Sequence, residues 1–254
     1  MAVKILGIIP ARYASTRLPG KLLIPIHGKT LLQRTFENTL QSSRLDKLLV
    51  ATDDVRIFDH VKNFGGHPIM TSPNCLNGSE RSADVLRIHP EFLETEAIVC
   101  IQGDEPCIDP TAIDKAVNLL LDDPTASMAT LISPLQTEEE ALDPSIVKCI
   151  TDLHNNALYF SRSLIPSNTK QRFNPKAKHY IHIGLYVYRP SFLQIYQSLP
   201  STPLQLEEDL EQLRVLEHGY RIKVAITEKP GIGVNTKEDL HKIEQYLCKQ
   251  NTSL

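Results

Sequence analysis

Short apolar runs alternate with amphipathic segments over the first half of the chain. The runs have the length and nearly unbroken hydrophobicity of strands buried on both faces of a sheet, and they lie at residues 5–9, 47–52 and 97–101. Residues 30–42 carry apolar side chains on one helical stripe, and so do residues 113–121. Strands that alternate with helices form parallel βαβ units. The pattern therefore predicts an α/β fold with a mostly parallel sheet flanked by helices.

The pattern is less regular after about residue 134. Helical stripes return in two places, at Leu206, Leu210, Leu213 and Leu216 and at Leu240, Ile243 and Leu247. Thr236 precedes the last stripe and Asp239 follows three residues later, which predicts a capped helix start. Residues 166–178 are polar and contain prolines, which predicts a loop. The length of 254 residues suits one domain that spans residues 1–254.

Residues 179–189 predict a strand with two different faces. Alternation places four apolar side chains toward the core, those of Ile181, Ile183, Leu185 and Val187. The opposite face carries His182, Gly184, Tyr186 and Tyr188. The glycine leaves room for a ligand between a histidine and a tyrosine, both of which can hydrogen-bond hydroxyl groups. We interpret this face as the wall of a candidate pocket, with an inert surface histidine as the alternative.

Composition and charge argue against several classes of partner. The net charge is −3 and the isoelectric point is near 6.3, so nothing favours a nucleic acid or an anionic membrane. No segment approaches the roughly 20 apolar residues of a membrane helix, and Pro10 and Arg12 interrupt the N-terminal run too early for a secretion signal. The five cysteines are scattered without a C-x-x-C pair, which argues against disulfides and structural zinc. We expect a soluble, cytoplasmic protein.

A polar loop follows each of the three apolar runs. In open α/β sheets, ligands bind beyond the carboxyl ends of the strands, so we expect the three loops at one edge of the sheet. The first loop, residues 10–21, is cationic, whereas residues 52–54 and 102–106 are acidic.

The cationic loop has the charge expected of a polyphosphate site. Six cationic side chains and no acidic one precede Glu37, namely Lys4, Arg12, Arg17, Lys21, Lys29 and Arg34. Arginine can grip a phosphate through two parallel hydrogen bonds, whereas lysine acts as a point charge. We assign phosphate binding to Arg12, Arg17 and Lys21, because they follow a strand end together with small residues. The other three cations fit a solvated surface.

Two familiar phosphate motifs are incomplete. Gly28-Lys29-Thr30 matches the end of a Walker A loop, but Leu23 stands where the motif needs its first glycine. The dinucleotide motif G-x-G-x-x-G is also missing after the first strand. The sequence therefore argues against a P-loop NTPase and against an ordinary dehydrogenase.

The acidic loops favour a metal ion. Magnesium prefers hard oxygen ligands and usually takes one or two carboxylates together with substrate phosphates. Asp104, just beyond a buried strand, is the best candidate ligand. Asp53 and Asp54 are weaker candidates, because an aspartate at the start of a helix is commonly its N-cap.

Residues 9–21 resemble the nucleotide loop of the CMP-Kdo synthetases, the 3-deoxy-manno-octulosonate cytidylyltransferases. Further matching blocks cover nearly the whole chain in the same order, at residues 78–81, 102–106, 159–162, 182–186, 210–214 and 231–236. The resemblance implies a nucleotide-diphospho-sugar transferase-like (Rossmann-like) sheet with a small dimerisation subregion, about residues 135–200. It also implies transfer of CMP from CTP to the anomeric 2-hydroxyl of 3-deoxy-D-manno-octulosonate (Kdo), with release of pyrophosphate, for lipopolysaccharide biosynthesis.

The same resemblance implies roles for individual residues in a homodimeric enzyme. The nucleotide-binding residues would be Ala11, Arg12, Arg17, Lys21, Ser79 and Arg81. The sugar-binding residues would be Gln102, Arg162, His182, Tyr186, Glu211 and Gln212. Asp104 and Asn235 would hold Mg²⁺, and Arg12, Lys21 and Asp104 would act in catalysis.

Two alternatives remain open. A cytidylyltransferase for another sugar acid, such as sialic acid, would share the cationic loop. A non-catalytic nucleotide-binding protein would be expected to lose the metal-binding carboxylate, whereas Asp104 is present.

Asn235 departs from the family pattern, which has an aspartate at the corresponding position. An amide oxygen can coordinate magnesium but brings no negative charge, so we expect the chain to need more Mg²⁺ than its Asn235→Asp variant or to rely more heavily on Asp104. Activity titrated against Mg²⁺ in both proteins tests this expectation. The same half-saturating Mg²⁺ concentration in the two proteins would refute it.

Overall fold

The computed structural model describes residues 3–14, 18–170, 172–228, 231, 233–234 and 236–251, without the side chains of residues 237 and 249–251. The strands are β1 (Ile5–Ala11), β2 (Pro25–Ile26), β3 (Lys29–Thr30), β4 (Lys47–Thr52), β5 (Pro68–Met70), β6 (Ala97–Ile101), β7 (Met128–Pro134), β8 (Lys148–Thr151), β9 (Ala157–Ser161), β10 (Tyr180–Tyr188) and β11 (Ile222–Ile226). The α-helices are α1 (Leu31–Thr39), α2 (Val55–Asn63), α3 (Gly78–Ile88), α4 (Pro110–Asp122), α5 (Glu138–Leu142), α6 (Pro190–Ser198), α7 (Pro203–Glu208), α8 (Glu211–Glu217) and α9 (Lys237–Asn251). Two 3₁₀ helices are η1 (Lys21–Leu23) and η2 (Pro90–Glu94).

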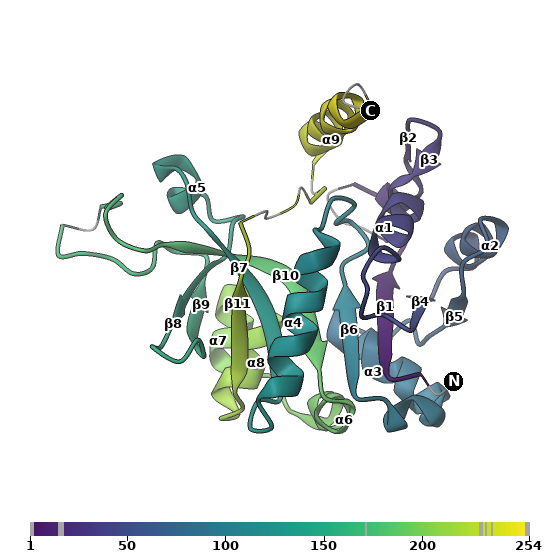
Figure 1. Ribbon diagram of the computed structural model, residues 1–254, viewed down its shortest axis with the longest axis horizontal. Coiled ribbons are helices and arrows are strands. Elements are labelled where there is room, and N and C mark those ends of the chain that lie inside the picture. The colour runs from purple at the N-terminus through teal and green to yellow at the C-terminus, as the bar shows by residue number, and fades with distance from the viewer. Residues whose placement is uncertain are drawn as a thin grey trace.

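One mixed sheet organises the described part of the chain (Figure 1). Its main path runs β11-β7-β10-β6-β1-β4-β5. The strands β6, β1, β4 and β5 pair in parallel, as the βαβ pattern predicts, whereas β10 is antiparallel to both of its neighbours β6 and β7. The prediction of a mostly parallel sheet flanked by helices is confirmed, with β10 as the antiparallel insertion in its centre.

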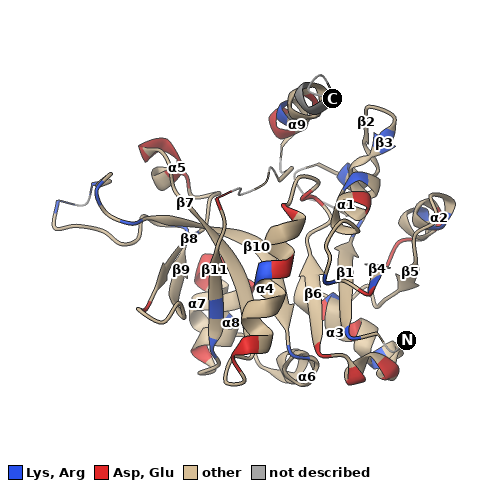
Figure 2. Cartoon of the chain, in the orientation of Figure 1, with Lys and Arg blue, Asp and Glu red and all other residues tan. Residues whose placement is uncertain are grey.

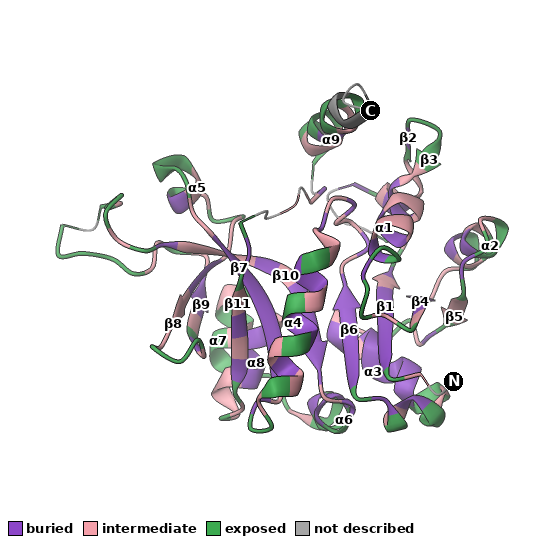
Figure 3. Cartoon of the chain, viewed as in Figure 1, coloured by how far each residue is buried: buried purple, intermediate pink, exposed green. Residues whose placement is uncertain are grey.

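Helices cover both faces of this sheet, and each face has its own hydrophobic core. The first core packs the sheet against α1, α2, α4 and α9, and the second packs it against α3, α6 and α8. Buried residues are accordingly concentrated on the central strands and on the inner sides of these helices (Figure 3). The five residues of β6 are all buried, which explains why its sequence is apolar without alternation.

The predicted helix starts are built by caps. Thr30 accepts a hydrogen bond from the Gln33 amide at the start of α1, and Asp54 caps α2 through the Arg56 amide. At α9 the Thr236 amide donates to Asp239 Oδ2 at 3.0 Å, and the Asp239 amide donates to Thr236 Oγ1 at 3.3 Å. The cap predicted from these two residues is therefore confirmed.

The leucine stripe from Leu206 to Leu216 does not form one helix. The chain breaks at Asp209, whose φ of 51° lies in the left-handed region, and the stripe is divided between α7 and α8. Leu206 is 69% exposed, whereas Leu213 is fully buried, so only the second half of the stripe faces the core. Apolar periodicity alone cannot show this break, because the spacing of the leucines continues across it.

The two faces of β10 are as predicted, although both contribute to a core. Ile183, Leu185 and Val187 belong to the first core, and Tyr186 and Tyr188 belong to the second. The pairing with β7 shifts its register between Ile183 and Tyr186, so the strand is irregular beside Gly184.

The strands β8 and β9 branch from the sheet beside β10, and residues 162–170 and 172–179 extend away from it (Figures 1 and 2). A buried lysine fixes the base of this branch. Lys148 is fully buried, and its ammonium group donates to the carbonyl oxygens of Asp143, Ile146 and Arg162 at 2.9, 2.7 and 2.5 Å. Three acceptors satisfy all three donors of the ammonium group, which is what allows a lysine to be buried.

Within the described residues, no helix has the length and hydrophobicity that crossing a membrane requires.

Candidate functional site

Lys21 joins three segments that are far apart in the sequence. The chain leaves β1 at Ala11 and returns through Gly20 into η1, which begins at Lys21. The ammonium group of Lys21 donates to Asp104 Oδ2 at 2.5 Å and to the carbonyl oxygen of Val234 at 2.8 Å. The Val234 amide donates in turn to the carbonyl oxygen of Asp104 at 2.9 Å. The predicted phosphate-binding lysine and the predicted metal-binding carboxylate thus lie in contact at the carboxyl edge of the sheet.

The neighbouring Glu105 shows how closely Gly233 lies against the acidic loop. Burial and the adjacent charge of Asp104 raise the pKa of Glu105 to about 8, and Lys21 offsets only part of this effect. A Cβ atom on Gly233 would lie 2.5 Å from Oε1 of Glu105. A larger residue at position 233 would therefore displace either the Glu105 side chain or the segment that carries Val234.

A cavity of about 470 Å³ opens at the same edge of the sheet. Its walls come from the loop after β1, the start of α3, the loop after β6, α7 and the start of α8. Five of the predicted site residues line it, namely Ala11, Arg12, Arg81, Gln102 and Glu211. The structure thus brings together nucleotide-binding and sugar-binding candidates from both halves of the chain.

Arg81 and Ser79 lie on the first turns of α3. The buried Arg81 guanidinium donates to Thr71 Oγ1 at 2.8 Å and forms an ion pair with Asp53 at 3.4 Å. Ser79 is fully buried, and its hydroxyl shares a hydrogen bond with the Tyr188 hydroxyl at 2.5 Å. Arg81 is one of the residues that line the cavity. The Ser79 hydroxyl, in contrast, is engaged by Tyr188 within the protein.

The predicted polar face of β10 meets α8. The His182 ring lies between Phe160 and Tyr186, with ring centroids 4.9 and 5.5 Å away, and its Nε2 is 2.9 Å from Thr130 Oγ1. Burial lowers the pKa of His182 to about 3, so the imidazole is neutral near pH 7. The Tyr186 hydroxyl donates to Gln212 Oε1 at 3.0 Å.

Gln212 and Glu211 present unused hydrogen-bonding capacity. The buried Nε2 of Gln212 has no hydrogen-bond partner within the described residues. An unpaired buried amide group is costly, although Gln212 is not among the described residues that line the 470 Å³ cavity. Glu211 accepts a hydrogen bond from the Ser79 amide at 3.3 Å, and burial raises the pKa of its carboxyl group.

Arg162 is engaged by backbone carbonyl groups. Its Nε donates to Glu208 at 2.7 Å, and its two terminal nitrogens donate to Pro144 at 3.0 Å and to Asp209 at 3.2 Å. It is not among the described residues that line the 470 Å³ cavity. In this conformation, Arg162 holds the turn between α7 and α8, and so it supports the position of Glu211.

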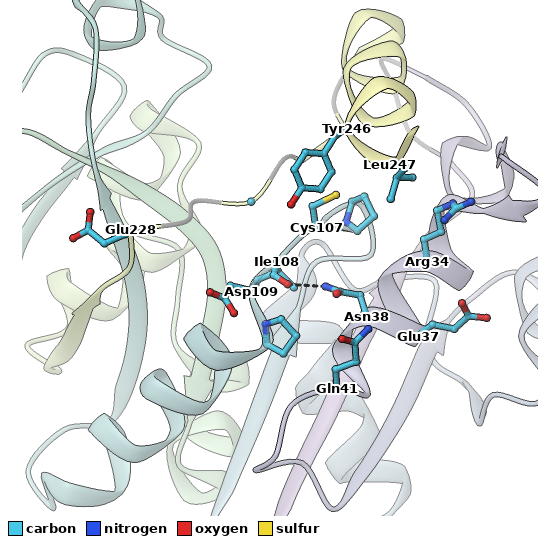
Figure 4. A pocket seen from close by; sticks show the side chains of 13 residues that line it. Arg34, Glu37, Asn38, Gln41, Cys107, Ile108, Asp109, Glu228, Tyr246 and Leu247 are labelled. Carbon is cyan, nitrogen blue, oxygen red and sulfur yellow. Dashed lines mark hydrogen bonds between the residues drawn. The ribbon is translucent and has the colours of Figure 1, made fainter. Parts of the chain in front are cut away.

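A larger hollow lies on the other side of the acidic loop, between α1, the start of α4 and α9 (Figure 4). Its volume is about 680 Å³, yet it contains none of the predicted site residues. The polar groups around it are largely engaged in the protein's own contacts. Arg34 donates to the Ile26 carbonyl group, Asn38 donates to the Ile108 carbonyl group, and Asp109 caps α4. We therefore place the site in the smaller cavity.

Two predicted residues, Arg17 and Asn235, lie outside the described residues. Gln205 and Asp209 also line the cavity, although no motif in the sequence assigned them to the site. The pattern Thr202-Pro203-Leu204-Gln205 could have indicated the start of α7, because it combines a capping box with proline at the first turn.

Comparisons with known proteins find a matching family, similar sequences and a similar solved structure. The sequence profile of the family described as "Cytidylyltransferase" matches residues 6–223. The chain is 60% identical to a 3-deoxy-manno-octulosonate cytidylyltransferase of Protochlamydia amoebophila (strain UWE25), over 100% of this chain and 98% of that protein. It is 49% identical to the Chlamydia trachomatis serovar L2 protein of the same name, over 96% of this chain and 94% of that protein. A solved structure of CMP:2-keto-3-deoxy-manno-octonic acid synthetase complexed with CTP is similar, with a TM-score of 0.89, 37% identity, and coverage of 97% of this chain and 99% of that one.

The neutral His182 predicts a loss of stability in acid. The unfolded chain takes up a proton as the pH falls through about 6.5, whereas the folded protein does so only near pH 3. This difference lowers the free energy of unfolding by about 2 kcal/mol between pH 7 and pH 5. Urea unfolding at the two pH values should therefore show a smaller decrease for His182→Gln than for the wild type. Equal decreases in the free energy of unfolding of the two proteins would contradict a neutral His182 in the folded protein.

Proposed function

Because the chain belongs to the cytidylyltransferase family, and within it to the 3-deoxy-manno-octulosonate cytidylyltransferases, we propose that it transfers CMP from CTP to the anomeric 2-hydroxyl of Kdo. Pyrophosphate is the second product, and the CMP-Kdo formed serves lipopolysaccharide biosynthesis. The observation that carries the proposal is the contact between Lys21 and Asp104 at the edge of the sheet that also holds the 470 Å³ cavity. Cationic and anionic groups at one edge of the sheet support binding of a nucleoside triphosphate and a polyhydroxylated acid there.

The reaction forms a bond between the anomeric oxygen of Kdo and the α-phosphorus of CTP, and the bond from that phosphorus to pyrophosphate breaks. Such a transfer depends mainly on alignment of the reactants and on stabilisation of charge. Arg12 lines the cavity, and Lys21 lies at the same edge of the sheet as the cavity. Both cations are therefore available to offset charge on the α- and β-phosphates. The hydroxyl proton leaves the anomeric oxygen during attack, and we assign no side chain as its acceptor.

Asp104 would hold Mg²⁺ together with the phosphates of CTP. The described residues contain no cluster of three or more histidine, cysteine or acidic side chains that could bind a metal alone. Magnesium needs only one or two protein carboxylates when substrate phosphates supply further ligands. The Asp104 side chain is 28% exposed, so its carboxylate is accessible for this purpose. When bound, the ion supplies positive charge to the triphosphate, and Asn235, which directly follows Val234, would be its second protein ligand.

The sugar acid would lie against α8 and β10. Gln212 offers its unpaired amide group, and Glu211 offers carboxylate oxygens to sugar hydroxyl groups. Gln102 lines the cavity beside Gly78, where a Cβ atom would come within 3.2 Å of its amide nitrogen. His182 and Tyr186 support this wall, because Tyr186 orients the Gln212 amide.

The enzyme would act as a homodimer in the cytoplasm. Exposed leucines on α5 and on the β8–β9 hairpin support an interface in the subregion of about residues 135–200, since Leu142, Leu153 and Leu158 are 60%, 100% and 58% exposed. None of the five cysteines forms a disulfide, which agrees with a reducing compartment.

Pyrophosphate release from CTP tests the proposed function. Purified protein with Mg²⁺ is assayed with Kdo and, in parallel, with N-acetylneuraminate. We expect release with Kdo and a much lower rate with N-acetylneuraminate. The reverse preference would assign the protein to the other sugar acid, and no release with any sugar acid would refute the proposal.

Lys21 and Asp104 should both be needed for turnover. Loss of one electrostatic stabiliser typically lowers kcat by about 100-fold or more, so we expect at least this decrease in Lys21→Ala and in Asp104→Ala. Lys29→Ala is the matched control, because Lys29 is exposed and paired with Glu37 rather than with the site. A near-normal rate in either folded site variant would remove that residue from the mechanism.

A further inference from the structure

Tyr13 and Gly20 lie side by side at the base of the cationic loop, and we call this pair the neck of the loop. A hydrogen bond closes the neck. The Gly20 amide donates to the carbonyl oxygen of Tyr13 at 3.0 Å. Gly20 has a φ of 68°, and a Cβ atom there would lie 3.1 Å from the Tyr13 ring, so the ring packs closely on the glycine. Arg12 immediately precedes this pair and Lys21 immediately follows it. The geometry of the neck therefore sets the spacing of the two proposed phosphate-binding cations.

The same tyrosine ring is covered by Arg56 from α2. The guanidinium carbon lies 3.3 Å from the ring centroid, which is the geometry of a cation–π contact. Asp54 holds the guanidinium through two hydrogen bonds, from Nε to Oδ1 at 2.9 Å and from Nη2 to Oδ2 at 2.6 Å. The Asp54 carboxylate also caps α2 by accepting from the Arg56 amide. The ring is thus connected to the start of a helix that packs on the sheet.

We propose that Tyr13 and Arg56 are positioning residues for CTP, which fix the neck of the loop and thereby the separation of Arg12 and Lys21. This inference rests on the proposed function. Among the described residues, the loop is otherwise held by the bond between Gly20 and Tyr13, by a hydrogen bond from the Lys21 amide to the Leu18 carbonyl oxygen and by burial of Leu18, whereas Ala14 and Pro19 are exposed. The ring contact restricts the neck before the triphosphate arrives, so less ordering remains to be done on binding.

Arg56 acts through the ring and not as a further phosphate ligand. Its planar fork is already occupied by the Asp54 carboxylate. It is also absent from the described residues that line the 470 Å³ cavity. A lysine at this position would keep the charge but would lose both the planar stacking and the paired hydrogen bonds.

Steady-state kinetics and equilibrium CTP binding of five variants test the inference. We expect Arg56→Ala and Tyr13→Leu each to raise KM and Kd for CTP about threefold to tenfold, with kcat and KM for Kdo within about twofold of the wild type. Tyr13→Phe keeps the ring and should match the wild type, and Arg56→Lys should be intermediate. Because the two side chains act as one unit, the double variant Arg56→Ala/Tyr13→Leu should be no worse than the weaker-binding single variant.

Lys62→Ala is the matched control, since it removes an exposed positive charge from the same helix without touching the loop. An effect of Arg56→Ala without one of Tyr13→Leu would overturn the inference, because it would indicate a charge effect alone. Additive effects in the double variant, or an unchanged CTP affinity in both single variants, would also overturn it. If the wild type binds CTP but does not use Kdo, the proposed substrate is wrong, and the CTP-binding measurements still decide the role of the neck.

Discussion

The contact between Lys21 and Asp104 is the interaction on which the site depends. It joins residues 83 positions apart, because β1 and β6 are neighbours and both end at the same edge of the sheet. The two side chains are only 12% and 28% exposed, and removing either charge from water alone would cost several kcal/mol. Each charge therefore compensates the other, and under the proposed function phosphates and a metal ion would replace this pairing. Val234 completes the arrangement by bonding to both residues through its backbone.

The rest of the site needs close approach between segments that the sheet alone does not bring together. Gly233 allows the segment after β11 to lie on Glu105, and Gly78 allows α3 to begin beside Gln102. On the opposite wall, Arg162 holds the turn at Asp209 from which α8 starts, so that Glu211 borders the cavity. Small residues and backbone contacts thus determine where the charged groups lie, and the charges in turn determine what the cavity can bind.

Much of the fold was predictable because strong hydrophobic periodicity reflects burial. The buried strands at residues 47–52 and 97–101 were located to the residue, and the capped start of α9 was found from Thr236 and Asp239. The break at Asp209 was not predicted from the leucine spacing. The carbonyl groups of Glu208 and Asp209 accept hydrogen bonds there from Arg162, which only the folded chain brings close. The antiparallel pairing of β10 could not be predicted either, since the direction of a strand is set by its connections and not by its local sequence pattern.

Within the candidate site, the loop that carries Arg12 and Lys21 was predicted from its local excess of positive charge. The bonds of Arg162 to backbone groups could not be predicted, since they depend on the tertiary structure.

A crystal structure of the protein with CTP and Mg²⁺ would show whether Lys21 and Asp104 bind the triphosphate and its metal ion. We expect a triphosphate within hydrogen-bonding distance of Lys21 Nζ and Arg12, with a metal ion coordinated by Asp104. A triphosphate bound instead in the 680 Å³ hollow between α1 and α9, or bound without contact to Lys21 and Asp104, would contradict it.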